Sequence, residues 1–244
     1  EAGWAGKAHE QLVSDLQNSG HQVEYLRYNS GKHISENGAA LSALLDQAVN
    51  KEGIGRISLV GHSMGGLIIR SALGHSSSTS WSSKVHSAVY LGSPHHGAPL
   101  ERIGNHANRL LKISPYTLPF MRLGNVRSAG IQDLRHGCIS TVDWALRESA
   151  DDVADHREPL PLAEGPRHTF IAATRSATIP TEPSQALDDY LVPVDSALGY
   201  CRHNRYTLHA DRINRHTIAG SNHMHLLSGR AVHRLIHQAV TARA

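Results

Sequence analysis

The stretch "RISLVGHSMGGLIIR", residues 56–70, decides the fold because it passes from a strand pattern to a helix pattern without a loop. Residues 57–60 are a short apolar run, and the apolar pattern resumes at residues 67–69 after Gly-His-Ser-Met-Gly-Gly. A bend this tight leaves one side chain, that of Ser63, on the turn, with glycines to leave room on either side. The sequence therefore predicts a strand, a tight turn carrying Ser63, and a helix.

The rest of the chain alternates between helix and strand patterns. Apolar spacing predicts helices over residues 8–19, 35–50, 64–74 and 224–241, and strands over residues 22–29, 56–60, 84–94, 168–174 and 214–220. This alternation predicts an α/β fold with a mostly parallel sheet and helices on both faces. The serine-rich stretch 75–83 is interpreted as a solvated loop.

The alternation stops between residues 100 and 165, where prolines interrupt an apolar stretch that is followed by a polar, acidic one. This pattern indicates a lid-like or cap insertion over the sheet and not a repeat or a separate domain. Its apolar residues fit either a lid with an acyl-chain pocket or ordinary core; they are Leu110, Leu111, Ile113, Leu118, Phe120 and Met121.

Length and composition narrow the classes of protein. A chain of 244 residues suits one large domain, and a net charge of +3 with scattered Lys and Arg does not indicate a nucleic-acid partner. No apolar run reaches the ~18–20 residues of a membrane span, and no signal segment opens the chain. Cys138 and Cys201 fit one disulfide or two free thiols, so the compartment is not indicated.

The motif G-x-S-x-G at residues 61–65, between a strand and a helix, is typical of a nucleophilic serine. A serine hydroxyl is a poor nucleophile at neutral pH, so Ser63 would need a histidine base that is oriented by a carboxylate. The backbone N–H of Met64, at the start of the helix, would point to where an oxyanion develops. The motif therefore predicts acyl transfer through Ser63.

Four ordered motifs extend this interpretation. They are "LVGHSMGG" (59–66), "LGSPHHGAPL" (91–100), "LVPVDSALG" (191–199) and "SNHMHLL" (221–227). From about residue 8 to the C-terminus the chain resembles the α/β-hydrolase superfamily, specifically its lipase/esterase branch of bacterial lipases and inositol-deacylase-like proteins. The resemblance implies the α/β-hydrolase fold, a small-molecule or lipid ester as substrate, and no cofactor.

The resemblance also implies the partners of Ser63. The family's acidic residue matches Asp189, with Tyr190 where the family has glycine, and Asp188 and Asp195 are the competing carboxylates. If that glycine has a positive φ, a tyrosine there carries a steric cost. The family's histidine matches His223, and the order Ser63, Asp189, His223 is the one expected for this fold.

The chain has 19 histidines, so each further histidine motif is discounted. His95 and His96 resemble a motif that supports the nucleophile, with oxyanion or metal roles as alternatives. His225 stands where calcium-dependent lipases have an acidic metal ligand, so no calcium is expected there. His233 and His237 have a spacing that could bind zinc, but without an evident third ligand they are interpreted as surface residues, and no metal is predicted.

One part of the family pattern is missing. No strand that ends in His-Gly, with its second oxyanion donor in the next loop, precedes residue 20. The family's strand order places that strand between residues 22–29 and 56–60, so we expect an N-terminally truncated hydrolase domain spanning residues 1–244. The alternative is a rearranged sheet in which these two strands pair directly.

Together these observations predict a serine hydrolase that cleaves carboxylic esters, with Ser63, Asp189 and His223 as its catalytic residues and Met64 N–H as an oxyanion donor. A thioesterase, amidase or acyltransferase with the same residues is an alternative. A non-catalytic binding protein of the same fold is another. The natural substrate, oligomeric state and localisation are not indicated by the sequence.

Overall fold

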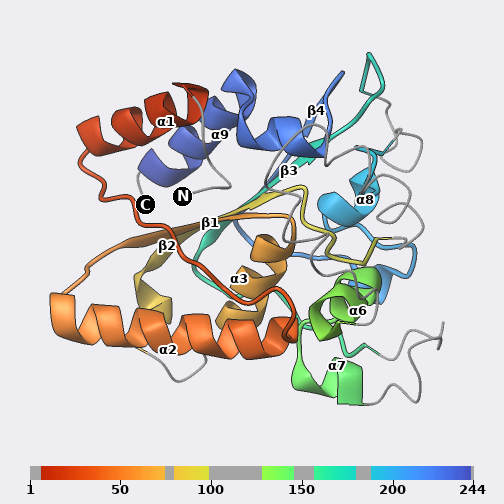
Figure 1. The fold of residues 1–244 in the computed structure, drawn as a ribbon, viewed down its shortest axis with the longest axis horizontal. Helices are drawn as coiled ribbons and strands as arrows, with labels where there is room; N and C mark the ends of the chain where they lie inside the picture. The colour runs from red at the N-terminus through yellow and green to blue at the C-terminus, as the bar shows by residue number, and fades with distance from the viewer. Residues whose placement is uncertain (1–6, 75–79, 99–127, 146–156, 180–187, 243–244) are drawn as a thin grey trace.

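The computed structural model describes residues 7–74, 80–98, 128–145, 157–179 and 188–242 (Figure 1). The described strands are β1 (Ile57–His62), β2 (Val85–Leu91), β3 (Arg167–Ala173) and β4 (Ile213–Ile218). They form one sheet in the order β1-β2-β3-β4, and every neighbouring pair is parallel. The prediction of a mostly parallel sheet is confirmed.

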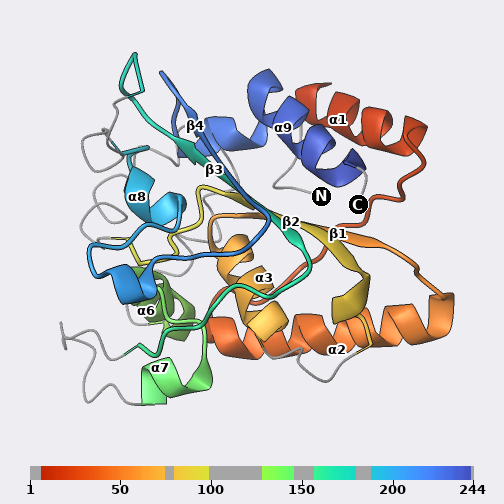
Figure 2. The same ribbon diagram turned by 180° about the vertical axis from the view of Figure 1, so that it is seen from behind.

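Helices cover both faces of the sheet, as predicted (Figures 1 and 2). On one face lie α1 (Lys7–Asn18) and α9 (Arg230–Thr241), and on the other lie α2 (Ile34–Glu52) and α3 (Met64–Gly74). The central strands β2 and β3 are almost wholly buried, whereas the outer strand β4 is mostly half-buried. Strands that are covered on both faces have continuous apolar runs, which explains the patterns of residues 84–94 and 168–174.

Alternating side chains of β2 divide the core into two layers. Val89 and Leu91 pack in a cluster with Leu16 of α1 and Ile236 of α9. Tyr90 packs on the opposite face, in the cluster that includes buried residues of α3. Because side chains alternate across a strand, one apolar strand supplies both layers.

The described part of the predicted insertion packs against α2. It contains α6 (Ala129–His136) and α7 (Thr141–Ala145). A Cβ on Gly130 would come within 2.2 Å of the Ser30 carbonyl oxygen, so only glycine permits this approach to the turn before α2. Leu134 packs in a cluster with Met64 and Leu67 of α3. The six apolar residues assigned to a lid or core, residues 110–121, lie outside the described residues.

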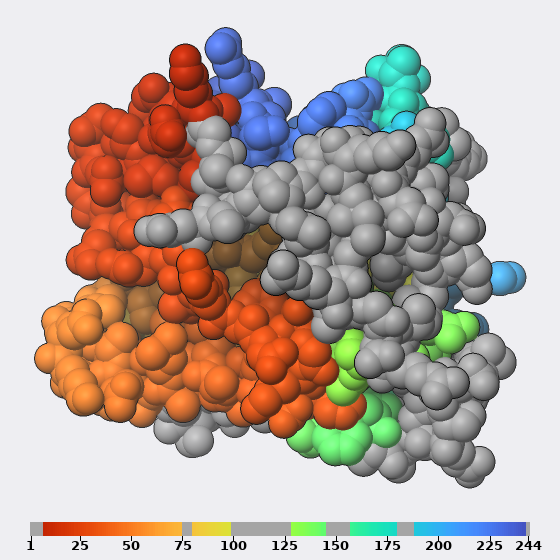
Figure 3. Space-filling model, in the orientation of Figure 1, coloured from red at the N-terminus to blue at the C-terminus, as the bar shows by residue number. Residues whose placement is uncertain are grey.

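The predicted strand over residues 22–29 is wrong. The structure has no regular element between α1 and α2, and in this segment Tyr25, Leu26 and Tyr28 are exposed. In the space-filling view this segment lies at the surface beside α1 (Figure 3). The pairing of residues 22–29 with 56–60 is also not found, since within the described sheet β1 pairs with β2. A strand needs a neighbouring strand to satisfy its backbone groups, and the sequence pattern cannot supply one.

Two smaller predictions also need correction. The predicted helix over residues 224–241 is two elements, the 3-10 helix η5 (His223–Leu227) and α9, because the chain breaks at Ser228 and Gly229. The stretch 75–83 is not wholly a solvated loop, since Trp81 is fully buried and its indole N–H donates to Ser42 Oγ at 3.0 Å. A buried indole with a hydrogen-bond acceptor anchors this loop to α2.

Candidate active site

Ser63 lies on the turn between β1 and α3, as the motif predicts. It is buried and has a φ of +53°, and its N–H donates to the Leu91 carbonyl at 2.9 Å. A Cβ on Gly61 would come within 2.6 Å of the Gly65 backbone, and one on Gly66 within 2.0 Å of Ser93 Oγ. Glycine at these two positions therefore permits the close packing of the turn against the start of α3 and the end of β2.

Met64 is the first residue of α3. Its side chain is fully buried in the cluster with Ile34, Leu67 and Leu134, which fixes the first turn of the helix. The N–H groups of a first helical turn have no partner within the helix, and the helix dipole makes this end positive. The start of α3 can therefore interact favourably with a negatively charged oxygen.

Asp189 and His223 form a buried pair. His223 Nδ1 is 2.7 Å from Asp189 Oδ2, and the two side chains are 3% and 1% exposed. Asp189 Oδ1 accepts hydrogen bonds from the N–H groups of Leu191 and Val192, at 3.0 and 2.8 Å. Because an ionised carboxylate can only accept, the proton of a neutral His223 ring lies on Nδ1, and Nε2 is left as the acceptor.

The two competing carboxylates lie in other contacts. Asp188 is 3.4 Å from the Arg175 guanidinium and accepts from the Tyr190 N–H, whereas Asp195 accepts from the N–H of Ser196. Tyr190 has a φ of +83°, so this position does have the conformation that favours glycine. The guanidinium of Arg175 lies 4.3 Å from the centre of the Tyr190 ring, a cation–π contact that helps to hold this conformation.

Two residues that the sequence analysis missed help to position His223. His62 Nε2 is 3.0 Å from the His223 carbonyl oxygen, and the two rings are 4.5 Å apart. Burial lowers the pKa of His62 to about 3, so the ring is neutral near pH 7 and its Nε2–H can donate to that carbonyl. The second residue is Gly92, with a φ of +57°, where a Cβ would come within 3.0 Å of His223 Nδ1.

The sequence held a signal for both residues. His62 is the variable position before the serine of G-x-S-x-G, and Gly92 opens the Gly-Ser-Pro that ends β2. The structure thus brings Asp189 and His223 into a hydrogen bond and sets His223 against the turn that carries Ser63. Within the described residues, Ser63 Oγ has no hydrogen bond to His223.

The remaining histidine predictions have mixed outcomes. His95 is buried, with its ring 5.1 Å from that of Tyr90, and the N–H of His96 donates to Ser196 Oγ, which fits a supporting role for this loop. His233 is not a surface residue; it lies on the buried stripe of α9, with Nε2 3.0 Å from the Leu227 carbonyl oxygen. In the described part of the chain no three His, Cys, Asp or Glu side chains are grouped to hold a metal ion.

Solved structures show the fold to which this chain is similar. The propeptide form of the lipase BlEst2 from Bacillus licheniformis superposes with a TM-score of 0.60 at 17% identity, over 100% of this chain and 48% of that one. The mature form gives 0.57 at 18% identity, over 96% of this chain and 84% of that one. EstA from Clostridium botulinum gives a TM-score of 0.51 at 14% identity, over 99% of this chain and 83% of that one. The chain thus has the fold of these proteins and spans about half of the propeptide form.

The remaining comparisons concern the sequence and its helices. No curated protein sequence matches this chain. Among the described helices, none combines the length and the apolar character that a membrane span requires. The family model of the PGAP1-like alpha/beta domain matches residues 2–159, more than half of the chain. With its parallel sheet, its covering helices and its lipase-like fold, the chain belongs to the PGAP1-like alpha/beta domain family of α/β hydrolases.

Proposed function

We propose that this protein is a serine hydrolase that cleaves carboxylic esters through an acyl-enzyme on Ser63. The observation that carries the proposal is the buried Asp189–His223 pair, which His62 holds against the turn that bears Ser63 and for which Gly92 leaves room. A serine on such a turn with an oriented imidazole is the arrangement used for acyl transfer in this fold. Membership of the family and the lipases of similar fold add support.

In the proposed first half-reaction, Ser63 Oγ attacks the carbonyl carbon of the ester and gives its proton to His223 Nε2. Asp189 holds the imidazole in the required tautomer and stabilises the cation that forms. The tetrahedral intermediate then collapses, the alcohol leaves with the proton from His223, and the acyl group remains on Ser63. In the second half-reaction His223 deprotonates a water molecule, which releases the acid and restores Ser63.

The N–H of Met64 is the proposed oxyanion donor. It lies at the start of α3, where the helix dipole is positive, and the buried Met64 side chain holds it in place. Substitution of the Met64 side chain does not remove its backbone N–H. The role is therefore tested by the structure of a phosphonate adduct on Ser63, in which the Met64 N–H should lie within hydrogen-bond distance of the phosphonate oxygen.

The proposed domain is the whole of residues 1–244, with residues 100–165 as a cap over the acyl chain of a lipid or small ester. A cap that responds to lipid aggregates predicts a jump in rate when the ester passes from monomers to aggregates. A smooth saturation of the rate with ester concentration through that point would contradict a cap that responds to aggregates. It would not affect the reaction proposed at Ser63.

Hydrolysis of short-chain p-nitrophenyl esters and labelling by a fluorophosphonate test the proposal. Ser63→Ala is expected to abolish the adduct and to lower kcat by roughly 10⁴-fold or more, and Asp189→Asn by a similar factor. Ser228→Ala is the matched control, because Ser228 is an exposed serine after η5, and it should keep the wild-type rate and adduct. Peptide mass spectrometry should find the phosphonate on Ser63.

The outcomes separate the alternatives. Faster turnover of thioesters or amides than of esters would show that the substrate is a thioester or an amide, with the same catalytic residues. A folded protein that neither hydrolyses any acyl substrate nor takes up the phosphonate would be a non-catalytic binding protein, and the proposal would be wrong.

A further inference from the structure

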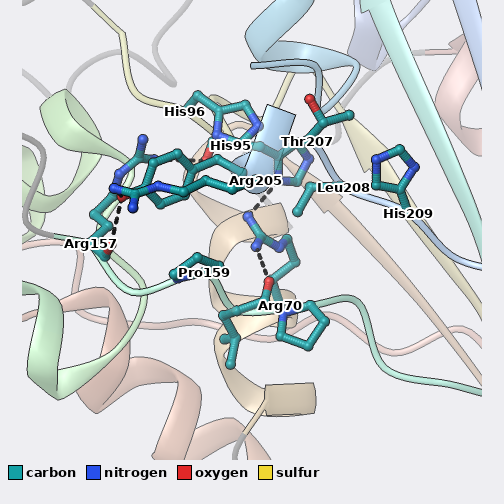
Figure 4. Close-up of a pocket in the computed structure, with 12 residues that line it drawn as sticks. Arg70, His95, His96, Arg157, Pro159, Arg205, Thr207, Leu208 and His209 are labelled. Atoms are coloured by element: carbon teal, nitrogen blue, oxygen red, sulfur yellow. Dashed lines mark hydrogen bonds between the residues drawn. The ribbon is translucent and has the colours of Figure 1, made fainter. Parts of the chain in front are cut away.

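A cavity of about 240 Å³ has a lining that includes none of Ser63, Asp189 and His223; Figure 4 shows its lining residues. Its lining joins α3 to the loop after β2, to residues 157–161 and to the loop before β4. Three arginines that are far apart in the sequence line it together, and histidines add further nitrogen atoms. The lining includes Arg70, His95, Arg157, Arg205, Tyr206 and His209. No Asp or Glu is among the described residues that line it.

The inner end of this cavity is formed by the buried guanidinium group of Arg70. Arg70 is only 6% exposed, donates from Nη2 to the Leu160 carbonyl at 3.0 Å, and has Nη1 3.4 Å from His95 Nδ1. Within the described residues its Nε has no hydrogen-bond partner. Burial, together with repulsion from Arg157, lowers the pKa of Arg70 to about 10, which still leaves it charged near pH 7. Asp143 attracts this charge but does not line the cavity, and burying a guanidinium group is costly, so this end of the cavity favours an anion.

At the outer end, two more guanidinium groups lie near the same aromatic ring, that of Tyr206. Arg205 and Arg157 lie 4.5 and 5.3 Å from the centre of the Tyr206 ring. Tyr206 Oη donates to the Arg157 carbonyl at 3.0 Å and accepts from Arg205 Nη2 at 2.6 Å. Arg205 and His209 are exposed, so this end of the cavity faces solvent, and Figure 4 shows the labelled arginines around it.

We propose that this cavity binds a phosphate group. Guanidinium groups match the oxygens of phosphate in paired hydrogen bonds, and a group with a charge near −2 offsets more of the positive charge here than a carboxylate does. The volume lies below the roughly 300–1,000 Å³ of sites that enclose a whole drug-sized molecule, so it fits an anionic group with little attached. This inference is independent of the chemistry proposed at Ser63.

Titration calorimetry at low ionic strength, with inorganic phosphate as the probe, tests the site. Arg205→Gln is expected to raise the Kd for phosphate about tenfold, as loss of a charge-assisted hydrogen bond does. Arg202→Gln is the matched control, since it removes the same charge from an exposed arginine in the same loop that does not line the cavity. Arg157→Gln is a second variant from another segment and should weaken binding in the same direction.

The source of the phosphate group is distinguished by a second probe. Glycerol 3-phosphate that competes with inorganic phosphate and binds more tightly would indicate a phosphorylated ligand, whereas weaker binding would indicate free phosphate, and both support the site. Each variant is first checked for the wild-type circular dichroism spectrum in phosphate-free buffer. The proposal is overturned if millimolar phosphate neither binds nor raises Tm, if acetate binds as tightly, or if Arg205→Gln and Arg202→Gln have the same Kd.

Discussion

Non-glycine residues with a left-handed backbone conformation lie at the candidate site. In the described part of the chain, Ser63 and Tyr190 are the non-glycine residues with positive φ. One is the proposed nucleophile and the other follows the proposed acid, and Gly92 beside His223 also has a positive φ. Such residues cost about 1–3 kcal/mol each when they are not glycine, so the surrounding packing must hold them. The backbone strain of the described chain is therefore concentrated where the proposed chemistry needs fixed positions.

Gly92→Ala tests the contact between the end of β2 and His223. An added Cβ meets a positive φ, Leu226 Cδ1 at 2.8 Å and His223 Nδ1 at 3.0 Å. We therefore expect a loss of about 2–3 kcal/mol in the free energy of unfolding and at least a tenfold lower ester turnover. Gly220→Ala is the matched control, since it has a φ of +60° but nothing within 4 Å of the added Cβ. Urea denaturation and kcat measured side by side separate backbone strain from displacement of His223. Equal effects of the two substitutions would contradict a role for the contact.

At the scale of elements, α2 begins against a carboxylate that is distant in the sequence. Asp133 of α6 is buried, and its Oδ2 accepts from the Ile34 N–H at 2.8 Å and lies 3.0 Å from His33 Nδ1. The Trp144 ring stacks on His33 at 4.2 Å, and its indole N–H donates to Ser35 Oγ. The first N–H groups of a helix need such acceptors, so α6 and α7 complete the start of α2.

Asp133→Asn is expected to lower the free energy of unfolding by about 2–3 kcal/mol, because it removes the negative charge from a buried acceptor at the helix start. Glu52→Gln removes the same charge from an exposed position at the opposite end of α2 and should change stability by less than about 0.5 kcal/mol. Chemical denaturation followed by circular dichroism compares the two. Similar stabilities for both variants would show that α6 does not stabilise α2.

At the scale of the whole molecule, several of the 19 histidines are held neutral by burial. Burial lowers the pKa of His62 to about 3 and that of His95 well below its ordinary value, and it also lowers the pKa of His168. His168 has Tyr90 Oη 3.0 Å from Nδ1 and the Ala163 carbonyl oxygen 2.9 Å from Nε2. Below about pH 6.5 the unfolded chain binds protons that these folded rings do not, so stability falls as the pH falls.

We therefore expect the free energy of unfolding to be about 3 kcal/mol lower at pH 5.5 than at pH 7.5. His168→Gln should lower the stability at pH 7.5 but reduce its further loss at pH 5.5, because one fewer ring must stay neutral. His225→Gln, at an exposed position, is the control and should show the wild-type change in the free energy of unfolding between pH 7.5 and pH 5.5. Urea titrations at both pH values measure this, and a flat profile would contradict the histidine argument.

The sequence alone determined the features that depend on neighbouring residues. The turn at Ser63 follows from an apolar run, closely spaced glycines and a second apolar run, and the structure has strand, turn and helix in that order. The patterns of residues 84–94 and 168–174 predicted strands, and the alternation of helix and strand predicted helices on both faces of the sheet. The helices α1, α2 and α3 begin and end within one or two residues of their predicted bounds. Periodicity and turn chemistry are local, so they can be seen without the fold.

Only the tertiary structure decided features that join distant segments. It selected Asp189 over Asp188 and Asp195 as the partner of His223, left residues 22–29 without a pairing strand, and buried His233. It also assembled the cavity proposed to bind phosphate from Arg70, Arg157 and Arg205, which no sequence motif links. The physical reason is that hydrogen bonding, strand pairing and desolvation depend on which surfaces meet, and a local pattern does not specify its partner.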